Sequence, residues 1–283
     1  MVQYGRPNAA IKCLERLRHD KRPLNSQQAV RVLQALLHSS ELTNAMDVHA
    51  IVEVIKALQD APDTNPDDLF QVEWAFLPFL DRHNGASPKL LEQRLADDPA
   101  FFCEVIRTVF RSNKDECPVE GLTERQKNIA TNAYHLLKEW RIPPGSQKDE
   151  FNGDALIDWL EEVKAASMES GHLEIALLMV GHVLIHTPPD PDGLWIHHSA
   201  AKVLNAKDAS DMREGFRTEL FNSRGVYSWT AGREERELAK KYRAQAEEVE
   251  ACGYHRLATA LRELADSYER DAEQQASNDP FDD

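Results

Sequence analysis

The chain has 283 residues, of which 42% are hydrophobic and 29% charged, so it can bury a sizeable core and is not a wholly disordered polymer. Asp and Glu outnumber Lys and Arg by 48 to 33, which gives a formal net charge of −15. A protein that binds nucleic acid mainly through the phosphate backbone carries a basic surplus instead, so this charge excludes that class.

The cysteines and the lengths of the apolar runs indicate the cellular location of the protein. The four cysteines, at positions 13, 103, 117 and 252, follow no zinc-binding or disulfide spacing, so we expect reduced thiols in a cytoplasmic protein. The N-terminal segment lacks the apolar core of a signal peptide. The longest apolar run, residues 173–185, is shorter than a membrane span and contains Glu174 and His182, so no membrane association is expected.

Helical periodicity dominates the first half of the chain. The first helix carries Ile11, Leu14 and Leu17 and stops before Pro23. Further helix starts are predicted at Asn25-Ser26, Asp47, Pro66, Ser87-Pro88 and Asp98-Pro99. Pro78 lacks an amide donor, so we expect it to kink or shorten the helix that begins at Pro66.

The second half is also predicted to be helical. A helix over residues 122–140 leads to the segment 142–152, whose prolines and glycines make it the best linker candidate. Four more helices are expected over residues 154–168, 173–185, 194–204 and 209–221. The last two helices, 234–251 and 254–272, share an apolar seam that predicts an αα-hairpin.

About thirteen helices joined by short loops, with no convincing strand, predict an all-α fold. We expect an N-terminal lobe over residues 1–142, a C-terminal lobe over 153–276 that ends in the hairpin, and a disordered tail over 277–283. Successive antiparallel helix pairs without a strict period favour an α-solenoid-like array of the degenerate HEAT-like kind. The helix over 173–185 is apolar nearly all round, which predicts burial of Leu177 or Leu178 at the centre of the second lobe.

Catalytic signatures are few. Nucleotide-binding glycine motifs, GxSxG and HExxH are absent from the sequence. The remaining candidate is a histidine-rich segment in which His182 and His186 are four residues apart and share a helix face with His172. With a carboxylate, such a set could hold zinc or another transition metal. Apolar residues lie on the same helix face, so we favour the interpretation that these histidines pack in the core and we expect no cofactor.

The same segment contains His197 and His198 beside Asp190 and Asp192. Asp190-x-Asp192-Gly193 resembles a fragment of a calcium-binding loop. However, a proline stands at the first ligand position and a serine at the twelfth, so a calcium loop is not predicted.

The loop over residues 224–233 is the candidate partner-binding site. Arg224, Tyr227, Trp229 and Arg233 combine aromatic rings with arginines, which is the composition of interaction hot spots. The rings either pack on the terminal hairpin or present a surface. We expect packing for Tyr227 and presentation for Arg224.

Several short segments resemble markers of one bacterial family. They are Tyr4-Gly5-Arg6-Pro7 with Ala9-Ala10-Ile11, residues 73–78, residues 98–102, Pro144-Gly145, residues 190–193 and residues 222–226. The family is the helical C-terminal region of large, poorly characterised bacterial multidomain proteins, some of them suspected in antiviral defence. The resemblance implies a helical repeat region that is attached to an effector domain or works beside one, and it supplies no catalytic residue.

These observations predict a non-enzymatic protein–protein interaction or sensor scaffold module in the cytoplasm. Its expected partner is a protein, such as an effector domain or chain, and neither nucleic acid nor membrane is an expected partner. The alternative is a metal-dependent hydrolase that uses the histidine cluster within residues 172–198.

Overall fold

The computed structural model describes residues 6–20, 22–37, 45–82, 85–114, 121, 123–148, 150–225 and 232–277. Regular structure in these ranges consists of thirteen α-helices with short 3-10 turns, and no strand occurs there beyond one isolated bridge between Ser146 and Phe151. The all-α expectation is therefore confirmed. No described helix combines the length and hydrophobicity that crossing a membrane requires.

The chain forms two compact units that are not contiguous in sequence. The first unit contains Met1–Leu95 and Val119–Trp140, and the second contains Ala96–Pro118 and Arg141–Asp283. Residues 96–118, which the sequence analysis places in an N-terminal lobe over 1–142, thus belong with the second unit. The reason is packing of α6 (Pro99–Val109) against α8 (Gly153–Ser170), where the ring centroids of Phe102 and Trp159 lie 5.1 Å apart.

The first unit holds five helices and all but the last two residues of a sixth, the helix over Lys89–Asp97. They are α1 (Pro7–His19), α2 (Ser26–Leu37), α3 (Ala45–Asp60), α4 (Pro66–Ala75), α5 (Lys89–Asp97) and α7 (Glu124–Glu139). As predicted, α4 ends before Pro78, which lies in the 3-10 turn η2 (Leu77–Phe79). The sequence predicts that Asp47 starts the third helix, but α3 begins two residues earlier, at Ala45, so Asp47 does not cap it. Its buried carboxylate instead pairs with Lys12 of α1 at 2.8 Å.

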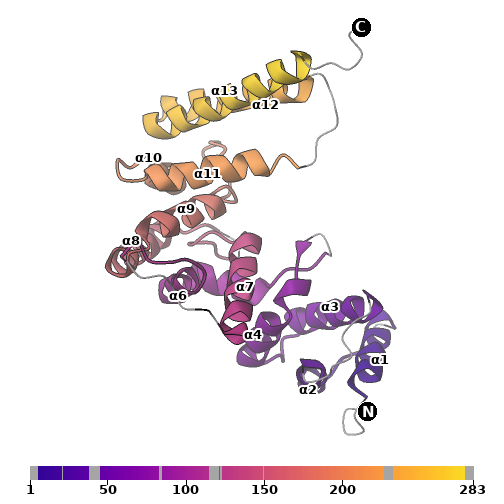
Figure 1. Ribbon diagram of the computed structural model, residues 1–283. Helices are drawn as coiled ribbons and strands as arrows, with labels where there is room; N and C mark the ends of the chain where they lie inside the picture. The colour runs from indigo at the N-terminus through magenta and orange to yellow at the C-terminus, as the bar shows by residue number, and fades with distance from the viewer. Residues whose placement is uncertain are drawn as a thin grey trace. The chain divides into compact units, whose positions relative to one another are not determined.

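The second unit contains α6, α8 and the remaining five helices in succession. They are α9 (Leu173–Leu184), α10 (His198–Asn205), α11 (Ser210–Asn222), α12 (Arg233–Ala251) and α13 (His255–Ser277). α10 begins four residues later than predicted, because a turn over residues 190–193 precedes it and its first amide donates to Asp190. α12 and α13 lie side by side and form the expected hairpin, whose turn contains Gly253 at φ 86° (Figure 1).

Helix α9 lies at the core of the second unit, where it contacts α6, α8 and α11. Leu177 is 3% exposed, as expected for this apolar helix. α9 meets α11 backbone to backbone: a Cβ added to Gly181 would lie 2.0 Å from the carbonyl oxygen of Met212. The contact is reciprocal, since a Cβ on Gly215 would lie 2.0 Å from the carbonyl oxygen of Leu178. The two glycines therefore permit the close approach.

The segment 142–152, expected to be a linker, is a hydrogen-bonded loop of the second unit. The amide of Asn152 donates to the carbonyl of Gly145 at 2.8 Å, and that of Gln147 donates to Glu150 at 2.9 Å. Gly145 has a φ of 87°, and an added Cβ would lie 2.3 Å from the Asn152 carbonyl oxygen. The prolines and glycines here form a compact turn rather than a flexible connection.

Candidate functional site

His172 is a buried structural residue. Its ring Nε2 lies 3.2 Å from the carbonyl oxygen of Phe110, and Nδ1 lies 3.1 Å from the Ser170 hydroxyl. A carbonyl only accepts, so Nε2 carries the proton and donates. Because His172 is the N-cap residue of α9, its ring is directed at the end of α6 and does not share the helix face of His182.

The alternative metal set His172, His182 and His186 does not converge among the described residues. Burial lowers the pKa of His182, and the nearby cation Arg141 lowers it further. The positive charge of Arg141 also disfavours a second cation beside His182. The structure therefore corrects this set, because one member turns away and another lies next to an arginine.

A different cluster has ligand atoms close together: Asp190, Asp192 and His198 each offer one ligand atom, and these three atoms lie within 4.8 Å of one another. The His198 Nε2 atom lies 2.8 Å from Asp192 Oδ2, and its Nδ1 lies 2.9 Å from the hydroxyl of Tyr254. Asp190 accepts from the His198 amide at 2.9 Å. The hydrogen bond with His198 is the main cause that lowers the pKa of Asp192.

His197 is adjacent to this cluster, and its Nε2 lies 3.8 Å from Asp190 Oδ2. Its Nδ1 accepts from the Ser199 amide at 3.2 Å, so in the neutral ring Nε2 carries the proton. Its ring lies 4.8 Å from that of Phe151 and lines a hollow of about 520 Å³ together with prolines of the loop 188–191. In the sequence, this cluster is visible as an Asp-x-Asp pair that precedes His198. The metal hypothesis was instead based on His182 and His186, because residues four apart share a helix face.

Arg224 lies inside the second unit instead of presenting a surface. Its guanidinium is 4.9 Å from the ring centroid of Phe221 and 5.6 Å from that of Tyr268. It also lies 3.7 Å from the carboxylate of Glu235, which is 1% exposed, and 3.9 Å from that of Asp271. The side chain of Arg224 is only 17% exposed, so the expectation of an outward arginine is corrected.

The rest of the predicted binding loop can be located only in part. Tyr227 and Trp229 lie outside the described residues. Of the predicted disordered tail over 277–283, Ser277 is instead the last residue of α13, and residues 278–283 lie outside the described residues. Arg233 is exposed and is the first residue of α12. The choice between packed and presented aromatic rings therefore stays a prediction.

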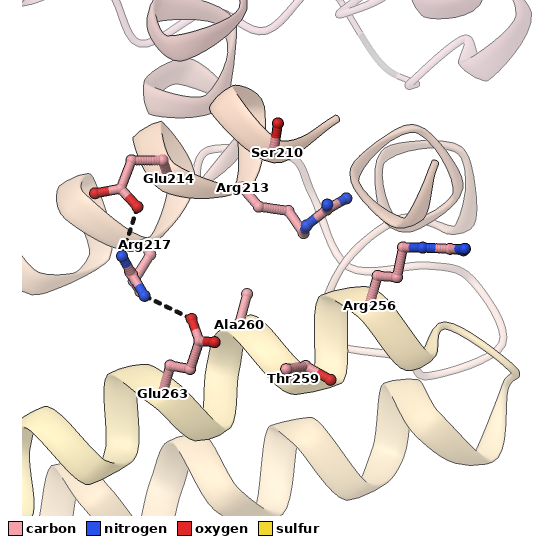
Figure 2. Close-up of a pocket in the computed structure, with 8 residues that line it drawn as sticks. All are labelled: Ser210, Arg213, Glu214, Arg217, Arg256, Thr259, Ala260 and Glu263. Carbon is pink, nitrogen blue, oxygen red and sulfur yellow. Dashed lines mark hydrogen bonds and ion pairs between the residues drawn. The ribbon is translucent and has the colours of Figure 1, made fainter. Parts of the chain in front are cut away.

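A groove of about 310 Å³ lies between α11 and α13 (Figure 2). Its charged residues are three arginines, Arg213, Arg217 and Arg256, and two glutamates, Glu214 and Glu263. The lining residues thus carry one net positive charge in a chain whose total is −15. Sequence reasoning missed this groove, because its residues come from two helices and belong to alternating charge patterns that are typical of solvated helix faces.

A buried carboxyl with a raised pKa lies in the first unit, at Glu73. Burial raises the pKa of this fully buried carboxyl to about 7. It accepts from the Gln59 side chain at 2.6 Å and from the amide of Leu91, in the first turn of α5, at 3.0 Å. These bonds join α3, α4 and α5, so we interpret Glu73 as a packing residue.

Comparisons with protein-family models, with curated proteins and with solved structures found no match for this chain. The resemblance to a bacterial helical region stays a prediction. The function has to be argued from the geometry described above.

Proposed function

We propose that this chain is a non-enzymatic protein-interaction module that acts in the cytoplasm beside an effector domain or chain. Its second unit supports a solenoid-like arrangement, because α8 packs on α9 and α12 on α13, while α10 and α11 lie between and each contact both of these pairs (Figure 1). Stacked helix pairs create extended surfaces that are suited to binding other proteins.

The groove between α11 and α13 is the observation that carries this proposal. It is formed by two packed helices, so its side chains project from a rigid scaffold. Its net positive charge differs in sign from the chain as a whole. We propose the loop that contains Tyr227 and Trp229, with the exposed Arg233, as a further contact with the same partner.

Affinity capture from the native host, with and without phage infection, tests the proposal. We expect one protein to be retained in near-stoichiometric amount and to co-elute with the chain in size-exclusion chromatography. Capture should be repeated with a variant whose groove charge is reversed and whose circular dichroism spectrum is unchanged. A chain that stays alone under both conditions would contradict the interaction function.

A metal-dependent hydrolase is the second candidate function, and the cluster of Asp190, Asp192 and His198 is the observation that favours it. Two carboxylates and one imidazole are a ligand set that zinc and related metals accept. Dialysis against zinc followed by elemental analysis tests it, with Asp192→Asn as the comparison. Stoichiometric zinc that the substitution abolishes, together with hydrolysis of a test ester or phosphoester, would favour the enzyme over the interaction module.

A further inference from the structure

We propose that the groove between α11 and α13 binds an acidic peptide segment of the partner protein, with a carboxylate held between Arg213 and Arg256. This inference rests on the interaction function proposed above and names the chemistry of the partner. Figure 2 shows the two arginines extending from facing helices toward one end of the groove.

Arg213 is held in place but is not neutralised by a carboxylate. Its Nη1 atom donates to the carbonyl oxygens of Leu204 at 2.7 Å and Ala206 at 2.8 Å, at the C-terminal end of α10. These bonds fix the guanidinium before any ligand arrives. Within the described ranges they involve Nη1 alone, which leaves the edge formed by Nη2 and Nε to form a bidentate pair with a carboxylate.

Arg256 places a second positive charge beside the first. Its side chain is exposed and reaches the carbonyl oxygen of Asn205 at 3.4 Å, at the outer limit of a hydrogen bond. Burial lowers the pKa of the Arg213 guanidinium, and repulsion from Arg256 is the next largest cause. Because the two cations repel each other, an anion placed between them gains energy from both.

The third arginine of the groove, Arg217, differs from the other two because carboxylates neutralise its charge. Arg217 lies between Glu263, at 2.6 Å, and Glu214, at the opposite end from Arg213 (Figure 2). The carboxylates that act on Arg213 from outside the groove do not form ion pairs with it, and Asp208 is held by Lys164 at 2.7 Å. Within the described part of the chain, the groove arginines that have no carboxylate ion pair are therefore the two at this end, Arg213 and Arg256.

A basic pocket in the first unit provides a contrast. Arg18, Lys56, Arg82 and Lys89 line a hollow of about 320 Å³ there. Each of them has a carboxylate partner within 3.4 Å, so the pocket offers no free positive charge. Within the described ranges, no carboxylate forms an ion pair with Arg213 or Arg256, which is why we place the ligand at their groove.

Charge and size select an acidic peptide as the occupant. A nucleic acid is a long polyanion that extends beyond the groove, so the net charge of −15 repels it. A short acidic segment stays within the groove and interacts mainly with the positive charge there. The groove volume of about 310 Å³ is at the lower end of ligand sites and suits one or two side chains rather than a large cofactor. The hydroxyl groups of Ser210 and Thr259 line the same groove and can contact the peptide backbone.

Fluorescence anisotropy with the full chain tests the inference. The probes are a labelled glutamate-rich peptide, the same peptide with glutamine at every glutamate, and a single-stranded oligonucleotide of equal charge. The test variant is Arg256→Glu, because Arg256 is exposed and its substitution removes one long hydrogen bond. The control is Arg125→Glu, an equal change of net charge at an exposed residue of α7 in the first unit.

We expect the glutamate peptide to bind with an affinity that decreases as salt is raised, and the glutamine peptide not to bind. Arg256→Glu should weaken binding at least about tenfold, because it places like charges together, while Arg125→Glu should leave it nearly unchanged. Equal binding of the two peptides, equal effects of the two variants, oligonucleotide binding as tight as that of the peptide, or no binding would each overturn the inference.

The two proposals can fail separately. A partner that Arg256→Glu still captures would retain the interaction function and overturn the acidic-peptide site alone. Should Arg256→Glu prove unfolded by circular dichroism, Arg256→Gln replaces it, with the same tenfold criterion and the wild-type salt dependence as a second readout.

Discussion

Replacing Gly181 by alanine should destabilise the second unit, although alanine is the better helix former. Gly181 is the ninth of the 12 residues of α9 and faces α11. An added Cβ would lie 2.0 Å from the carbonyl oxygen of Met212 and 2.7 Å from the amide nitrogen of Phe216. Ordinary contact begins at 3.4 Å, so the helices would have to separate locally by about 1.4 Å.

Two opposing effects decide the magnitude. Alanine gains about 1 kcal/mol over glycine in a helix interior. Overpacking of a well-packed core costs about 1–3 kcal/mol, and the upper end applies here because the obstructing atoms are backbone atoms that cannot rotate away. We therefore expect Gly181→Ala to lower the free energy of unfolding by about 2 kcal/mol, measured by urea denaturation.

Gly215→Ala tests the same contact from the other helix, since its Cβ would meet the Leu178 carbonyl oxygen at 2.0 Å. Once one alanine has separated the helices, the second costs less, so the double variant should lose less than the sum of the single losses. Gly121→Ala is the control, because no atom lies within 4 Å of its added Cβ. Equal or higher stability of Gly181→Ala would refute the backbone-level approach of α9 and α11.

Three further predictions concern stability. Glu73 has a folded-state pKa of about 7 against 4.5 when unfolded, so the unfolded chain loses its proton first and stability falls as pH rises through that window. Glu73→Gln should remove this fall, which is at most about 3 kcal/mol, in urea denaturation at both ends of the window; an unchanged pH dependence would contradict it. Arg224→Ala leaves the buried carboxylate of Glu235 uncompensated and should cost about 2 kcal/mol by thermal denaturation, whereas the exposed Arg233→Ala should cost almost nothing. Leu177→Ala should cost about 2–5 kcal/mol in urea denaturation, and a loss below about 1 kcal/mol would show that α9 is not central to the core.

Local structure was the part of the fold that could be predicted from sequence. Asp98-Pro99 marks the start of α6, and the structure shows the reason: the Asp98 carboxylate accepts from the Phe101 amide at 3.0 Å. Pro78 ends α4 because it cannot supply an amide donor. Such signals act within one helical turn, so they can be read without knowing the rest of the fold.

Features set by distant residues could not be predicted in this way. Arg224 faces inward because Tyr268 and Glu235 surround it, and neither residue is close to it in sequence. The groove arginines Arg213 and Arg256 come from separate helices, so no local pattern joins them. The metal hypothesis for His172, His182 and His186 failed for the same reason. The ring of His172 is oriented by the carbonyl of Phe110, which is 62 residues away in sequence.

The glycine contact between α9 and α11 has a mechanical consequence. Because backbone touches backbone at Gly181 and Gly215, those two helices have little freedom to slide, and we expect them to move as a stiff slab. Across the next layer, α11 meets α13 through side chains: Arg217 forms an ion pair with Glu263, and the ring of Phe221 stacks on that of Tyr268 with centroids 5.1 Å apart. Side chains can adjust their rotamers where backbone atoms in contact cannot. We therefore expect any relative movement of helices within the second unit to occur between α11 and α13 rather than between α9 and α11.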